Sequence, residues 1–159
     1  MIADNHIFYI FSWMNKEILL QRLQHLSLTT EAKFGILTPQ HMVEHLVLTL
    51  KMCAGRIPIP EIVPTEKQLA GKQALLFTDL PFPKGIKGPG LPDTLLDLRF
   101  PDLETAKEEL IKSWDAYQLL FKEIPTKQTP HPGFGLLNFD EWERFHAKHI
   151  DHHLSQFGC

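Results

Sequence analysis

The distribution of proline is the feature that most restricts how this chain can fold. Eight of the twelve prolines lie between Gly55 and Pro101. Proline lacks a backbone N–H and clashes with the preceding helical turn, so this density excludes a long helix and disfavours central strands. Only a short helix, over Glu66–Leu76, fits between the prolines. We therefore expect a long connection over residues 55–101 that separates two helical parts of the chain.

Four segments outside this connection place apolar residues every three or four positions, which is the spacing of amphipathic helices. Thr38 followed by Pro39 marks the start of the second segment, and Asp102 marks the start of the third. Asn138 precedes Glu141 by three residues, the spacing of a capping box at the start of the fourth. The expected helices cover residues 15–28, 39–54, 103–124 and 138–158.

A connection of this length changes the order in which helices can pack. It can return the chain to the same end of a bundle, so the second and third helices can run parallel. We therefore predict an all-α fold, a four-helix bundle of up-down-down-up order with the crossover between helices two and three. The 159 residues are expected to form one domain. Residues 1–14 are expected to form an N-terminal arm or to extend the first helix.

Composition excludes several classes of protein. The longest apolar stretch, Ile7–Met14, is shorter than the roughly 20 residues of a membrane span, and the N-terminus lacks the pattern of a secretory signal. The net charge of −3 provides no electrostatic footprint for nucleic acid. Two cysteines form no disulfide framework. We expect a cytoplasmic protein with no membrane or nucleic-acid partner; a homodimer is compatible with the sequence but does not follow from it.

Histidine is unusually concentrated near the C-terminus. Four of the nine histidines, His146, His149, His152 and His153, lie within eight residues. Residues four apart are neighbours on a helix, so His149 and His153 can reach one metal ion. His146 and His152 are less well placed and remain substitutes whose roles the sequence leaves open.

Two histidines make a weak site, and His45 is the best candidate for a third ligand because it lies in the apolar stripe of its helix. It lies nine residues before the end of that helix, and His149 lies ten residues after Phe139. If the two helices are antiparallel with these ends level, His45 and His149 meet at a similar depth. His41 would then lie level with His153 as a reserve ligand or a neighbouring contact.

Spacing alone leaves a second interpretation open, in which the histidines form a polar helix face and carry no metal. One metalloenzyme class can be excluded. His149 and His153 have the outer spacing of the zinc-protease motif HExxH, but Ile150 stands where the general-base glutamate would be. We expect Asp151 to support a neighbouring group or a cap instead.

Two stretches resemble the DinB-like superfamily of metal-binding helical bundles. Residues 34–46, FGILTPQHMVEHL, resemble its second-helix signature, and residues 149–158, HIDHHLSQFG, resemble its fourth-helix signature. The sequence HPGFG at 131–135, with Glu141-Trp142 before the tail KHxDHHxxQFG, is similar to a branch of uncharacterised bacterial domains. The resemblance extends over nearly the whole chain from Asn15 onward.

The resemblance implies an up-down-down-up bundle with a divalent metal held by three histidines, which by position are His45, His149 and His153. Zinc is the first expectation, with nickel or iron as alternatives. Two residues depart from the branch: Phe34 stands where tryptophan is common, and Ser155 where arginine is usual. These departures concern a docking contact or an anionic-ligand contact, and they leave the three histidines intact.

Three neutral imidazoles leave a divalent ion its full charge and an open position, as in catalytic zinc sites. A bound water can then ionise near pH 7, and a bound thiol is deprotonated. Relatives in the superfamily include thiol-dependent S-transferases and isomerases. We therefore expect a metal-dependent enzyme that acts on an adduct of a low-molecular-weight thiol, or a hydrolase. The alternative is a non-catalytic metal-binding module with a stress-response or interaction role.

Four further residues are candidates for contacts with substrate or with the metal ligands. His41, Glu44 and Gln156 lie close in sequence to the proposed ligands. His131 can approach the site from the loop before the last helix, or can equally be a loop residue in solvent. The sequence does not assign any of them a catalytic role.

Overall fold

The computed structural model describes residues 14–88 and 90–159 of the chain. Within these ranges the protein is mostly helical, with five helices and one short β-hairpin. In chain order the elements are α2 (Lys16–Gln24), α3 (Pro39–Cys53), α4 (Glu66–Phe77), α5 (Leu103–Glu123), β1 (Thr129–His131), β2 (Gly135–Leu137) and α6 (Phe139–Gln156). The predicted N-terminal arm lies outside the described residues, except for Met14, which is buried in the core.

The predicted helix starts are confirmed by the capping contacts. The Thr38 side chain accepts a hydrogen bond from the backbone N–H of His41, which caps α3. The Asp102 side chain caps α5 in the same way. Asn138 and Glu141 form both bonds of a capping box at the start of α6. Local side-chain chemistry therefore determines where these three helices begin.

The first helix is shorter than predicted. It ends at Gln24, with His25 as its C-cap, and does not continue to Leu28. The N–H of Ser27 donates to the Thr30 hydroxyl at 2.9 Å in place of a helical carbonyl. A hydroxyl near the backbone competes with the helix for such donors. Leu26 remains buried in spite of the early end, so its apolar position in the sequence pattern reflects core packing and not helix length.

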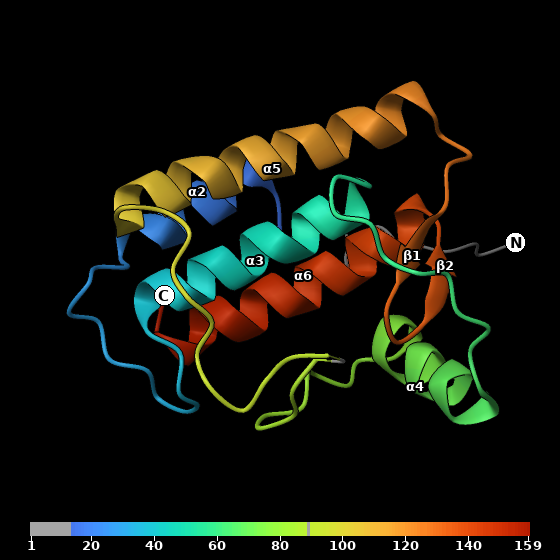
Figure 1. Cartoon of the computed structure of the whole chain (residues 1–159), viewed down its shortest axis with the longest axis horizontal. Coiled ribbons are helices and arrows are strands. Elements are labelled where there is room, and N and C mark those ends of the chain that lie inside the picture. Colours follow the sequence, from blue (N-terminus) through green and yellow to red (C-terminus); the bar gives the residue numbers. More distant parts are fainter. Residues whose placement is uncertain (1–13, 89) are drawn as a thin grey trace, which may run out of the picture.

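The helices α2, α3, α5 and α6 lie side by side, with α4 set apart near the start of α6 (Figure 1). Helix α3 lies between α5 and α6 and contacts both, and α2 packs on α5. The buried apolar side chains come from all four of these helices; the largest include Leu19, Leu46, Leu50, Leu110, Tyr117, Trp142, Ile150 and Leu154. A central position for α3 places the middle of that helix in the core and leaves His45 half-buried beside α6.

The hairpin before α6 was not predicted from the sequence. Thr129 pairs with Leu137 and His131 pairs with Gly135 in antiparallel register. The hairpin holds the start of α6 in place, because the Thr129 hydroxyl accepts a hydrogen bond from the Trp142 indole at 2.8 Å. Three-residue strands give too short an alternation to be recognised without their partner.

The short helix predicted within the long connection is confirmed as α4, and its C-terminal end is attached to α6 by one side chain. The Nζ of Lys148 donates to three backbone carbonyls, those of Leu75, Thr78 and Leu80, at 2.5, 2.6 and 2.7 Å. Carbonyls at a helix end lack intrahelical donors, so an ammonium group stabilises this end strongly. The connection is therefore fixed to α6 just before it passes the histidines.

The far end of the connection is attached to α3 in a comparable way. The Glu44 carboxylate accepts hydrogen bonds from the backbone N–H groups of Arg99 and Phe100 at 2.8 and 3.2 Å. His41, one turn earlier, lies 3.0 Å from the Leu96 carbonyl through its Nε2. Bonds to a charged acceptor are among the stronger hydrogen bonds in proteins. The connection is therefore attached to α6 at Leu80 and to α3 at Leu96, Arg99 and Phe100.

His146 is a core residue and does not belong to a polar helix face. It is 1% exposed, and its ring stacks on Trp142 and lies 4.8 Å from the ring of Tyr117. Burial, with a smaller effect from His131, lowers the pKa of His146 to about 3. Its Nε2 is buried and has no hydrogen-bond partner among the described residues. An aromatic pocket of this kind favours an uncharged ring.

We expect His146→Phe to keep or raise the free energy of unfolding at pH 7, by up to about 1 kcal/mol, because it removes an unpaired buried nitrogen. Below pH 6.5 the unfolded chain protonates His146, while the folded chain does so only near pH 3. The wild-type protein therefore loses stability as the pH falls from 6.5, and the variant loses less.

Urea unfolding at pH 7 and pH 5 measures both effects. His25→Phe, at an exposed position, is the control for the exchange of residue type. A variant that is less stable at pH 7 and equally sensitive to acid would contradict this assignment of His146 to the core.

Candidate metal centre

Three histidines from two helices meet; His149 is buried, and His45 and His153 are half-buried. His45 lies in the middle of α3, and His149 and His153 lie one turn apart on α6. The Nε2 atoms of His45 and His149 are 3.0 Å apart, and one nitrogen from each of the three residues lies within 4.8 Å of the others. The predicted meeting of His45 with His149 is confirmed. Together the three form a cluster that could hold a metal ion.

The spacing of the His45 and His149 nitrogens is close to that of two ligands of one cation. Zinc–nitrogen bonds of about 2.0–2.1 Å in a tetrahedral site place two ligand atoms about 3.3 Å apart. The separation of 3.0 Å between His45 Nε2 and His149 Nε2 is close to this value. The other ring nitrogen of His149, Nδ1, is buried without a hydrogen-bond partner among the described residues. The Nε2 contact is therefore the principal polar contact of the His149 ring.

The electrostatic environment keeps these histidines neutral. Burial, followed by the charge of His152, lowers the pKa of His45 to about 4. Burial and then His45 lower the pKa of His153 to about 3. The pKa of His149 is well below its ordinary value, first because of burial and then because of the neighbouring histidines. Neutral imidazoles offer lone pairs at pH 7, which is the form that binds a metal.

Gln156 orients one of the three rings. Its Nε2 donates to the Phe34 carbonyl at 2.7 Å, which turns its Oε1 toward His153 Nδ1 at 3.1 Å. An amide oxygen only accepts, so His153 Nδ1 must carry the proton and Nε2 keeps the lone pair. Hydrogen bonding to the far nitrogen is how proteins fix the tautomer of metal-binding histidines. Gln156 was a sequence candidate for such a contact.

Gly35 provides the space for this glutamine. Its φ of +79° is in the left-handed region, and a Cβ at this position would lie 2.6 Å from Gln156 Nε2. Glycine reaches this conformation without a steric penalty. The Phe34-Gly35 pair of the second-helix signature therefore contributes a carbonyl acceptor and a close backbone approach.

The other sequence candidates lie outside the cluster of three. His41 bonds to Thr38 through Nδ1 and faces the Leu96 carbonyl through Nε2. The Glu44 carboxylate accepts hydrogen bonds from the backbone N–H groups of Arg99 and Phe100 at the end of the connection. Both side chains therefore contact the long connection, and neither is part of the cluster.

His131 is buried in the hairpin and does not extend into solvent. Its Nδ1 accepts a hydrogen bond from the N–H of Gly133 at 3.0 Å, and its ring stacks on Phe134. Burial, with a smaller effect of Lys72, lowers its pKa to about 4. The ring of Phe145 contacts both His131 and His149, at 4.7 and 5.0 Å between centroids. Phe145 therefore separates His131 from the cluster.

Two aromatic residues, Phe82 and Phe34, lie at the edge of the cluster, and sequence reasoning did not find Phe82. The ring of Phe82 lies 5.2 Å from that of His149 and 5.7 Å from that of His152. The ring of Phe34 lies 5.3 Å from that of His152. Phe82 belongs to the proline-rich connection, whose sequence contains no signal for the helix it contacts. Its position follows from the attachments of that connection to α6 and α3.

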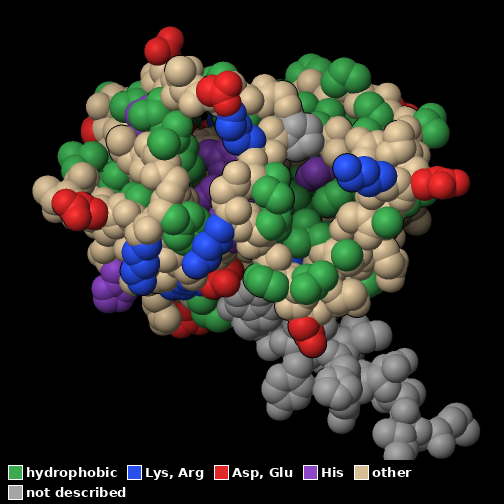
Figure 2. All heavy atoms as spheres, turned by 90° about the horizontal axis from the view of Figure 1, so that it is seen from below, with side chains coloured by type: hydrophobic (Ala, Val, Ile, Leu, Met, Phe, Trp, Pro, Cys, Tyr) green, Lys and Arg blue, Asp and Glu red, His purple; other side chains and the backbone are tan. Residues whose placement is uncertain are grey.

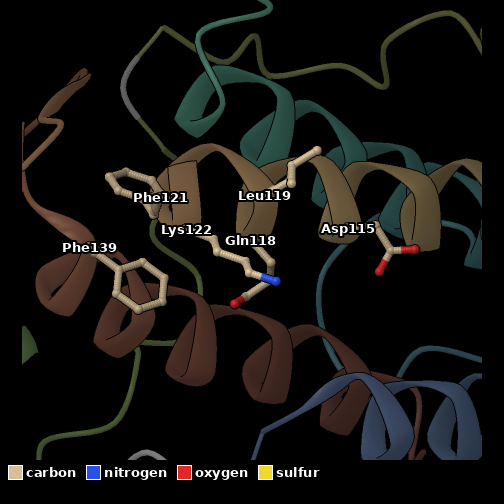
Figure 3. A pocket seen from close by; sticks show the side chains of 6 residues that line it. All are labelled: Asp115, Gln118, Leu119, Phe121, Lys122 and Phe139. Carbon is tan, nitrogen blue, oxygen red and sulfur yellow. The ribbon is translucent and has the colours of Figure 1, made fainter. Parts of the chain in front are cut away.

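A separate surface depression lies between α5 and the start of α6 (Figure 3). Its lining residues are Asp115, Gln118, Leu119, Phe121, Lys122 and Phe139. It includes one carboxylate and one ammonium group but no histidine. We assign no chemistry to it.

Part of this site lies in a region that is similar to a known protein family. The family model described as "Protein of unknown function (DUF1569)" matches residues 99–158. The matched region contains α5, the hairpin and α6, so it includes His149 and His153 but not His45. No curated protein and no solved structure matches the chain. Among the described residues, no helix combines the length and the apolar character needed to cross a membrane.

We expect Gln156→Leu to weaken metal binding by about 10-fold to 100-fold, the usual effect of losing a contact that orients a ligand. Without the amide oxygen, His153 is free to present either nitrogen to the ion. Competition with a chromophoric chelator measures the affinity. Gly35→Ala should act in the same direction, because its Cβ displaces the Gln156 amide.

Ser155→Ala is the matched control, since the Ser155 hydroxyl contacts Arg22 and Asp151 and not the cluster. Unchanged affinity in both Gln156→Leu and Gly35→Ala would show that the glutamine does not orient His153.

Proposed function

We propose that this protein is a metal-binding helical domain of the DinB-like kind, in which α2, α3, α5 and α6 form an up-down-down-up bundle. The side-by-side arrangement of these helices supports this proposal (Figure 1). The long connection between α3 and α5, attached to the bundle at both ends, is the crossover that this order requires. The similarity of residues 99–158 to a family of unknown function neither adds to nor conflicts with it.

The proposed ligands are His45, His149 and His153, with zinc as the expected ion and nickel or iron as alternatives. One observation carries this assignment: a nitrogen from each of the three lies within 4.8 Å of the others. Their low pKa values and the orientation of His153 by Gln156 support it further. Three neutral ring nitrogens this close together favour a metal site over the alternative that the histidines are ordinary packing residues.

The chemistry we propose is that of a metal-dependent enzyme acting on an adduct of a low-molecular-weight thiol, as a transferase or isomerase, or acting as a hydrolase. A divalent ion held by three neutral ligands ionises a bound water or thiol near neutral pH. The chain itself holds His153 in one tautomer and covers His149 with the ring of Phe82, which limits the access of water to that side.

A non-catalytic metal-binding module, with a stress-response or interaction role, is the second candidate, and one observation favours it. The two carboxylates closest in sequence to the ligands are both engaged. Glu44 accepts backbone N–H groups, and Asp151 pairs with Arg22 at 2.8 Å. Neither is therefore free to act as a general base without breaking a structural contact.

We expect protein purified without an affinity tag to contain about one equivalent of a divalent transition metal. His45→Ala and His149→Ala should each lose most of it, because two histidines alone bind weakly. Elemental analysis measures the content, and His25→Ala, at an exposed position, is the control. If no metal is found in the wild-type protein and none binds on addition, the metal assignment is wrong.

Turnover distinguishes the two candidates. Metal-loaded protein, metal-stripped protein and His45→Ala are compared on thiol conjugates and simple hydrolysable esters. The enzyme predicts turnover that depends on both the metal and His45. A fully metal-loaded protein that is inactive on the whole panel favours the module.

A further inference from the structure

The outer edge of the histidine cluster is built from aromatic rings and one cation. Phe34 and Phe82 both contact the ring of His152, which lies next to His153. The Nζ of Lys84 lies 4.8 Å from the centre of the Phe34 ring. We call these four residues, Phe34, Phe82, Lys84 and His152, the rim. Figure 2 shows histidine side chains recessed on one face of the molecule, with both cationic and acidic side chains on the surface around them.

The charge of Lys84 has no carboxylate partner among the described residues. Five other lysines form ion pairs: Lys16, Lys51, Lys72, Lys87 and Lys107. Lys148 is engaged with three carbonyls. Among the described residues, the contact recorded for the Lys84 ammonium group is the one with the Phe34 ring, which itself contacts His152. The ammonium group therefore lies against an aromatic ring that contacts one of the histidines.

The rim and a metal ion bound beside it would together carry an excess of positive charge. The three proposed ligands are neutral, so a bound divalent ion keeps both of its positive charges. The rim adds the charge of Lys84 and contains no carboxylate. The nearest acidic side chain on α6, Asp151, is held by Arg22. An excess of positive charge at this edge attracts anions, and the rings of Phe34 and Phe82 favour a ligand with an apolar part.

The position of Lys84 is determined by the fold. It lies four residues after Leu80, whose carbonyl is bound by Lys148. Phe82, between them, rests on His149 and His152. The segment that carries the ammonium group is therefore attached to α6 on the same side as the cluster, and its contact with Phe34 extends the rim to the loop before α3.

We propose that the site binds a small organic anion whose one end coordinates the metal and whose carboxylate pairs with Lys84. The apolar part of this ligand lies against Phe34 and Phe82. The inference rests on the proposed metal site and adds to it a substrate class and a specificity residue. It assigns a role to the Lys84 ammonium group, which metal binding does not use.

Paired thiols test this proposal on Co²⁺-loaded protein, in which the visible spectrum reports thiolate coordination. Mercaptopropionate and mercaptohexanoate are compared with mercaptopropanol and mercaptohexanol, which have the same thiol and chain but no charge. We expect the acid of at least one pair to bind about three to five times more tightly than its alcohol, the size of an exposed ion pair. This preference should decrease as salt is added.

Substitutions of Lys84 test whether this side chain causes the preference for the acid over the alcohol. Lys84→Ala should abolish it and Lys84→Glu should reverse it, whereas Lys84→Arg should retain it. Lys112→Ala on α5 makes the same change in net charge at an exposed position on another helix, and should leave the preference intact.

The outcomes separate this inference from the metal assignment. If wild-type protein and Lys84→Ala bind Co²⁺ with equal stoichiometry and show the same ratio of acid to alcohol affinity, Lys84 does not select the ligand and the inference is overturned, while the metal site stands. If neither protein binds Co²⁺, the metal assignment and this inference are both wrong.

Discussion

The contact between α3 and α6 at His45 and His149 is the constraint on which the rest of this structure depends. Two neutral ring nitrogens that lie 3.0 Å apart at a part-buried contact favour either a shared proton or a shared cation. Every other feature of the site is arranged around this contact. Gln156 turns His153 toward the same point, Phe82 covers one side, and burial keeps the rings uncharged. The histidines are buried or half-buried, and their ring nitrogens are unprotonated at neutral pH. These are conditions that favour the binding of a transition metal.

The proline-rich connection contributes to the site as well as to the topology. A segment with so few backbone hydrogen bonds of its own needs side chains to hold it. Lys148 binds carbonyls at the end of α4, and Glu44 binds N–H groups before α5. Both donors and acceptors come from the helices that carry the histidines. The attachment of the connection and the geometry of the cluster are therefore linked: the same two helices position both.

The histidines divide into groups with different physical roles. His146 and His131 are held among aromatic rings and are part of the core or hairpin packing. His41 bonds to the connection, and His152 stands at the rim. Only His45, His149 and His153 bring ring nitrogens together within the described part of the chain. A high histidine content thus reflects one compact cluster with supporting residues, and it does not indicate a histidine-rich surface.

Features that depend on neighbours in sequence could be predicted from the sequence alone. These are the caps at Thr38, Asp102 and Asn138, the short helix between the prolines, and the four-residue spacing of His149 and His153. The meeting of His45 with His149 also followed from helix register, because both lie at similar distances from helix ends. The early end of α2 and the three-residue hairpin were missed, since one hydroxyl ended the helix and the strands are too short to show alternation.

The tertiary structure alone decided which side chains support the cluster. Gln156 reaches Phe34 across 122 positions of the chain, and Lys148 reaches Leu80 across 68. Glu44 is close in sequence to a proposed ligand, yet its carboxylate accepts hydrogen bonds from the backbone N–H groups of Arg99 and Phe100. His131 could have been in solvent, and the hairpin buried it. The spacing of residues along a helix defines which side chains share a face, but the partner of that face depends on how distant segments pack, which no local pattern encodes.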